Sequence, residues 1–213
     1  MPGAMRNWQR KEKASKFAKI TSTVKKPVPL RESISLTIYK LRAQEGRLDQ
    51  SYQRMQRNYN GLFEKCTNAV VSKDSTRASM YANECSEIKK MCQTILSSKF
   101  ALEQVVLRLE TMQEFGDVMM EMSPVAGVID SIKGHLQGVI PEVSHNLGEI
   151  GNTLNDLVID SGGVVERSWN VMSSGGGAEK ILTEANIIAE MRMKENFPTL
   201  PDTDTKLGSL ERS

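Results

Sequence analysis

Proline is missing from a continuous stretch of 94 residues, Leu30 to Ser123. In the first half of this stretch, apolar residues follow one another at alternating steps of four and three. Only Glu45, which is charged, interrupts this apolar series. The series is Ile34, Ile38, Leu41, Leu48, Tyr52, Met55, Tyr59, Leu62, Cys66 and Ala69. Such a repeat keeps one seam of a helix facing one partner over a long distance. Because an internal proline would break the helix, its absence supports the pattern.

A second apolar series follows a short polar break at residues 72–75. It consists of Ile88, Met91, Ile95, Ser98, Leu102, Val105, Leu109 and Met112, of which Ser98 alone is polar. Two long helices with matching seams and a short connection predict an antiparallel helical hairpin over residues 31–123, with helices at about 30–71 and 76–122. Asp74 or Ser75 is expected to cap the second helix, and Pro124 to end or kink it. The fold class predicted is all-α.

Shorter elements are expected after Pro124. The sequence of residues 124–177 predicts short helices at about 125–139 and 141–159. It also predicts glycine-rich linkers, which include Gly175 to Gly177. Residues 178–197 predict a C-terminal amphipathic helix with Ile181, Ala185, Ile188 and Met191 on one face. The polar tail at 198–213 is expected to be disordered.

The charge of the chain is strongly graded along its length, although the formal net charge is only +2. Residues 1–30 hold eight Lys or Arg and one Glu, whereas residues 116–213 hold seven basic and fifteen acidic residues. A basic head and an acidic tail predict an anionic partner for the head and possible self-masking by the tail.

The basic arm at residues 1–30 alternates cationic and apolar groups, which is typical of segments that lie in the headgroup region of an anionic membrane. We predict that it binds membrane through Trp8, Arg10, Lys11, Lys13, Lys16, Phe17 and Lys19. Two alternatives stay open from the residues alone. The arm can be a disordered tail without a specific partner, or its charges can bind nucleic acid. Since no groove-entering element or stacking platform is visible, no nucleic-acid partner is expected.

The first predicted helix carries a basic row outside its apolar seam. Lys40, Arg47 and Arg54 are seven residues apart and therefore share one face, to which Lys65 nearly returns. A basic row roughly 35 Å long suits a flat anionic surface. The alternative is an ordinary solvated flank of a coiled coil.

Residues that would indicate catalysis or a cofactor are scarce. The two histidines, His135 and His145, lie on different predicted helices, and Ser173 to Gly177 has neither the lysine nor the preceding strand of a phosphate-binding loop. Cys66, Cys85 and Cys92 lie in helical seams without metal-ligand spacing and predict buried, reduced thiols. We expect no enzyme activity, no cofactor and no metal, and no stretch approaches the length of a membrane span.

The order of these elements and several local sequences resemble the ESCRT-III family, in particular its archaeal CdvB-type members. The second long helix matches in Tyr81–Glu84, Ile88–Lys90, Ser98–Glu103 and Arg108–Thr111, and the last helix matches in Ala178–Ala185 and Phe197–Pro201. The resemblance covers about residues 15–201. Unlike the fullest archaeal pattern, this chain is expected to lack a C-terminal winged-helix module.

The resemblance implies a cytoplasmic protein, peripheral on the inner face of the cell membrane at the division site. It would polymerise with itself and with paralogues, remodel and sever membranes in archaeal cytokinesis, and be disassembled by an AAA ATPase. In the family the last helix packs on a hairpin tip, either its own or a neighbour's. The implied subunit contact here joins Leu62, Ala69, Val70 and Val71 to Ile181, Ala185 and Ile188. The rival interpretation is a soluble coiled-coil adaptor whose arm binds nucleic acid or protein.

Overall fold

The computed structural model describes residues 30–115, 122–160 and 175–198, and within these ranges it contains α-helices and no strand. The helices are α1 (Leu30–Val71), α2 (Ser75–Phe115), α3 (Met122–Leu136), α4 (Pro141–Asp160) and α5 (Gly175–Asn196). The all-α class is confirmed. Helix α1 has the bounds that its periodicity predicts, and α2 is described as far as Phe115, so the predicted extension over residues 116–121 lies outside the described residues.

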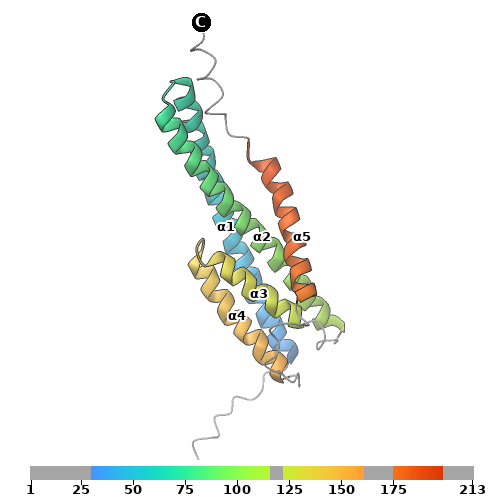
Figure 1. Cartoon of the computed structure of the whole chain (residues 1–213). Helices are drawn as coiled ribbons and strands as arrows, with labels where there is room; N and C mark the ends of the chain where they lie inside the picture. Colours follow the sequence, from blue (N-terminus) through green and yellow to red (C-terminus); the bar gives the residue numbers. More distant parts are fainter. Residues whose placement is uncertain (1–29, 116–121, 161–174, 199–213) are drawn as a thin grey trace, which may run out of the picture.

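Helices α1 and α2 form the predicted antiparallel hairpin, and their seams are its core (Figure 1). Eight of the ten apolar positions predicted on α1 are buried, and Met55 and Leu62 are half-buried. On α2 the predicted series is also buried, apart from the half-buried Met91. The repeat predicts this packing because residues three and four apart lie on one face of a helix.

The turn between the two long helices is a Schellman motif. The N–H of Asp74 donates to the carbonyl oxygen of Ala69 at 2.9 Å, and the N–H of Lys73 donates to that of Val70 at 3.0 Å. Lys73 has a φ of 58°, in the left-handed region that this motif requires. The carboxylate of Asp74 then accepts from the N–H of Arg77 at 3.1 Å, which confirms Asp74 as the cap of α2.

The left-handed residue of this turn gives a first prediction. Glycine adopts such a φ without the steric cost that Lys73 incurs. We therefore expect Lys73→Gly to raise the free energy of unfolding by about 0.5–1 kcal/mol. Urea unfolding followed by circular dichroism measures the change. A variant less stable than the wild type would show that the Lys73 side chain contributes more than its backbone conformation costs.

The remaining helices cover the open end and one side of the hairpin (Figure 1). Helices α3 and α4 form a second, shorter hairpin, in which α4 contacts α1 while α3 contacts α2 and α5. Helix α5 lies along α2, and the tip of the long hairpin projects beyond the other helices (Figure 1). The hairpin tip therefore remains uncovered by the chain's other described helices (Figure 1).

Two predicted helix boundaries were wrong. Pro124 was expected to end or kink the second helix, but it lies in the first turn of α3, where its missing N–H costs nothing. Gly175 to Gly177 were expected to form a linker, but they form the first turn of α5. A Cβ on Gly177 would lie 3.1 Å from Cβ and Cγ of Pro124, so the absence of a side chain lets α5 approach α3 closely.

Candidate interaction surfaces

The basic row of α1 lies on the exposed side of the hairpin. Lys40, Arg47, Arg54 and Lys65 are all exposed, opposite the buried seam. Arg47 forms an ion pair with Glu142 of α4, and nearby the amide of Asn146 donates to the side-chain oxygen of Gln44 at 3.3 Å. The acidic C-terminal part of the chain thus contacts the basic row at Arg47, between Lys40 and Arg54. An exposed ion pair is worth at most about 1 kcal/mol, so this contact is easily broken.

The predicted arm residues lie outside the described residues. These are Trp8, Arg10, Lys11, Lys13, Lys16, Phe17 and Lys19. Their role in membrane binding stays a prediction.

The hairpin tip exposes three apolar side chains, Val70, Val71 and Met80, which we call the exposed tip residues. Val71 is 76% exposed, and Val70 and Met80 are also exposed. The two other tip residues predicted to make a subunit contact are placed differently, because Ala69 is buried and Leu62 is half-buried against the hairpin core. Of the four, only Val70 and Val71 are exposed, at 37% and 76% of their surface.

Helix α5 has a buried face and an exposed apolar face. Ile181 and Ala185 are fully buried in the face that packs on α2 and α3. Ile188, which was predicted on the same face, is 40% exposed, and Met191 is exposed as well. The buried set instead continues through Ala189 and Met193, since packing follows steps of four along a straight helix.

The exposed apolar face of α5 consists of Ile187, Ile188 and Met191. In this structure the helix does not cover its own hairpin tip but lies along α2. Whether it contacts a neighbour's tip stays a prediction.

Glu45, the one residue out of type in the first seam, lies among charged groups between α1 and α2. Arg42 pairs with Glu110, and Lys99 lies 2.6 Å from Asp49 and 3.9 Å from Glu103. Four carboxylates therefore share two cations, and Oε1 of Glu45 is buried without a hydrogen-bond partner. Burial, followed by the charge of Glu103, raises the pKa of Glu45 from an ordinary 4.5 to about 7.

The three cysteines are free and buried, as predicted. Burial raises the pKa of the Cys92 thiol to about 11 and also raises the pKa values of Cys66 and Cys85. A thiol that remains protonated is a poor nucleophile and a poor metal ligand. The role of the three cysteines is therefore to pack in the seam between α1 and α2.

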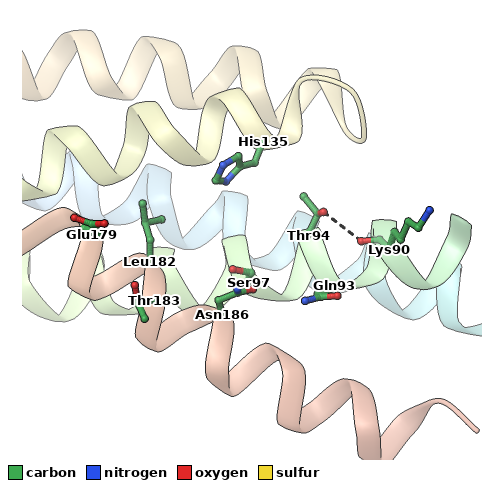
Figure 2. Close-up of a pocket in the computed structure, with 9 residues that line it drawn as sticks. All are labelled: Lys90, Gln93, Thr94, Ser97, His135, Glu179, Leu182, Thr183 and Asn186. Carbon is green, nitrogen blue, oxygen red and sulfur yellow. Dashed lines mark hydrogen bonds between the residues drawn. The ribbon is translucent and has the colours of Figure 1, made fainter. Parts of the chain in front are cut away.

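An open hollow lies where α2, α3 and α5 meet (Figure 2). It measures about 520 Å³ and is lined mostly by uncharged polar side chains, with Lys90, His135 and Glu179 as its titratable residues. The dashed line in Figure 2 is a bond within α2, from the Thr94 hydroxyl to the Lys90 carbonyl at 3.2 Å. The hollow is open and its titratable groups form no nucleophile–base pair.

Residues 30–115, 122–160 and 175–198 contain neither a metal-binding cluster nor a membrane-spanning helix. No group of three or more His, Cys, Asp or Glu side chains there is placed to hold a metal ion. No helix in these ranges is both long and apolar enough to cross a membrane.

Comparison with known proteins places this hairpin in a family. Cell division protein B1 of Sulfolobus acidocaldarius is 44% identical over 173 residues, which cover 81% of this chain and 81% of the relative. The chain belongs to the CdvB family. This membership confirms the resemblance to CdvB-type ESCRT-III proteins, and the α1–α2 hairpin has the fold which that resemblance implies.

Two other CdvB proteins of the same organism are more distant. Cell division protein B is 32% identical over 86% of this chain and 70% of the relative. Cell division protein B3 is 28% identical over 66% of this chain and 81% of the relative. No protein-family model and no solved structure matches the chain.

Two features of the CdvB chain were missed at the sequence level. Glu45 was noted as out of type, but a single sequence does not indicate which charges face it across the hairpin. Phe197 was noted only as part of a matching segment, although it is 4% exposed and packs on aromatic residues of α1. Its spacing of four residues from Met193 on the buried face of α5 was the available signal.

Proposed function

We propose that this chain is a filament-forming subunit that remodels and severs membranes in archaeal cell division. The relatives named as cell division proteins support the role in division. The observation that carries the membrane part is the exposed row of Lys40, Arg47 and Arg54 along the rigid α1. Once Arg47 exchanges Glu142 for the membrane, such a row presents its charges to a flat anionic surface together. Each basic residue near that surface contributes about 1 kcal/mol.

The filament part of the proposal is supported by two separate sets of exposed apolar side chains. One set is the exposed tip residues Val70, Val71 and Met80, and the other is the exposed face of α5. Two different apolar surfaces on one chain favour head-to-tail contacts, which build open polymers when the rotation does not close. The partners proposed are copies of this chain and its paralogues, an anionic membrane and an AAA ATPase that disassembles the polymer.

The protein would act as a peripheral component on the cytoplasmic face of the membrane and not as an enzyme. The alternative function is a coiled-coil adaptor whose basic arm binds nucleic acid or another protein. An adaptor needs the hairpin and the arm but neither polymerises nor deforms vesicles.

The contribution of the basic arm can be measured with a charge-matched pair of variants. Replacing Arg10, Lys11, Lys13, Lys16 and Lys19 by Ala should weaken binding to anionic liposomes by at least about tenfold, because up to about 5 kcal/mol of attraction is removed before screening by salt. Co-sedimentation at low and high salt measures the loss.

The control for the arm variant removes the same charge from exposed lysines elsewhere. These are Lys73, Lys90, Lys133, Lys180 and Lys194. The control should bind more tightly than the arm variant. Equal weakening by both variants would show that net charge alone matters and that the arm is not the binding site.

The subunit contact can be tested at Ile188, which the chain leaves exposed. Ile188→Asp should abolish or strongly reduce filament assembly, since it puts an unpaired charge into an apolar contact at a cost of several kcal/mol. The helical circular dichroism should be unchanged. Thr183→Asp, exposed on the same helix but outside its apolar face, is the control and should assemble normally. Normal filaments from Ile188→Asp would place the contact elsewhere.

A further inference from the structure

The segment that follows α5 is held in an aromatic site on α1. The ring of Phe197 meets that of Tyr59 edge to face, with centroids 4.6 Å apart and planes at 75°. It meets Tyr52 in the same manner at 6.4 Å and 67°. Tyr59 in turn stacks on Phe63 at 6.1 Å. Edge-to-face pairs at these separations contribute more binding free energy than their buried area alone provides. The three aromatic residues of α1 therefore form a favourable binding site for one aromatic ring.

Polar contacts fix the backbone and the neighbours of Phe197 in the same place. The hydroxyl of Tyr59 donates to the carbonyl oxygen of Pro198 at 3.1 Å, and the amide of Asn196 donates to the hydroxyl of Tyr52 at 3.2 Å. Burial raises the pKa values of both tyrosines, so both hydroxyls stay protonated and available as donors. The site thus contacts both the ring of Phe197 and the carbonyl oxygen of Pro198.

The rest of α5 is attached to the hairpin mainly by small side chains. Its buried face contains three alanines, Ala178, Ala185 and Ala189, and only two large residues, Ile181 and Met193. Alanines let two helices approach closely but bury little apolar area. Phe197 is the largest buried side chain of this segment, so a large share of the docking free energy depends on it.

We propose that Tyr52, Tyr59 and Phe63 form a recognition site for a Phe–Pro segment, and that its occupation by the chain's own Phe197–Pro198 holds α5 on the hairpin. Tyr59 of the site and Pro198, whose carbonyl oxygen it binds, are 139 residues apart in sequence. The contact is therefore a latch between the C-terminal segment and α1. It does not depend on membrane binding or on filament formation.

Hydrogen exchange of the full chain tests this latch. In Phe197→Ala, amides in the middle of α5 should exchange roughly 100-fold faster than in the wild type, because loss of a buried Phe shifts the docking equilibrium strongly. Tyr59→Phe, which removes only the hydroxyl that bonds Pro198, should accelerate exchange by roughly threefold to tenfold. The core amides of α1 and α2 should keep their protection in both variants.

The control is Glu190→Ala, at an exposed position of the same helix outside its apolar face. It should leave α5 exchange unchanged. If the amides of α5 exchange at rates within twofold of one another in Phe197→Ala and Glu190→Ala, Phe197 does not hold the helix. Loss of protection throughout α1 and α2 would equally overturn the proposal, because Phe197 would then support the hairpin itself.

Discussion

Replacement of Leu102 by alanine should lower the free energy of unfolding by about 3 kcal/mol. Leu102 lies in the predicted seam of α2, is 0% exposed and belongs to the core shared with α1. The variant loses the transfer free energy of the leucine side chain and leaves a cavity that a helical seam fills only in part. Urea unfolding followed by circular dichroism gives the difference.

The control for this prediction is a second leucine on the same helix. Leu107 is 61% exposed, so Leu107→Ala should change the free energy of unfolding by less than about 0.5 kcal/mol. Similar losses for both leucines would indicate that the two faces of α2 are equally buried in solution. That result would be incompatible with the hairpin seam.

Glu45→Gln should stabilise the protein at pH 8 and have little effect at pH 4. The folded-state pKa of about 7 lies above the ordinary value of 4.5, so the folded protein binds this proton more tightly than the unfolded chain. Stability from this group is therefore present below pH 4.5 and is lost as the pH rises through 7. The two values set an upper limit of about 3 kcal/mol, and solvent at the partly accessible side chain reduces the expected gain to about 2 kcal/mol.

The measurement is a pair of urea titrations, at pH 4 and at pH 8, for the wild type and for Glu45→Gln. Glu64→Gln, on an exposed position of the same helix, is the control and should show no such pH-dependent gain. If Glu45→Gln is not more stable than the wild type at pH 8, the carboxylate cluster does not destabilise the hairpin. The positive charges of Arg42 and Lys99 would then be sufficient to balance the four carboxylates around them.

The hairpin was predictable because its signals are local and repeated. Ten apolar positions on α1 keep one register, and Asp74 marks the turn with a cap. The same logic failed at single residues whose role depends on neighbours distant in sequence. Pro124 suits the first turn of a helix as well as the end of one, and the structure places it in the first turn of α3.

The basic row of α1 and the exposed face of α5 were predictable only in part, because they too depend on contacts between residues distant in sequence. Lys40, Arg47 and Arg54 are exposed as the spacing indicates, but the pairing of Arg47 with Glu142 depends on how α4 folds back on α1. On α5 the step of three from Ala185 to Ile188 fits a heptad, whereas the actual packing follows a step of four to Ala189. Short helices show too few repeats to distinguish these registers.

Electron microscopy of vesicles after co-sedimentation tests the central claim most directly. The wild-type chain is mixed with vesicles that contain anionic lipid and, separately, with neutral vesicles of the same size. We predict that the protein sediments with the anionic vesicles, coats them with filaments and deforms them into tubes, and that it leaves neutral vesicles bare. Protein that stays in the supernatant beside smooth anionic vesicles would contradict the account and favour the adaptor.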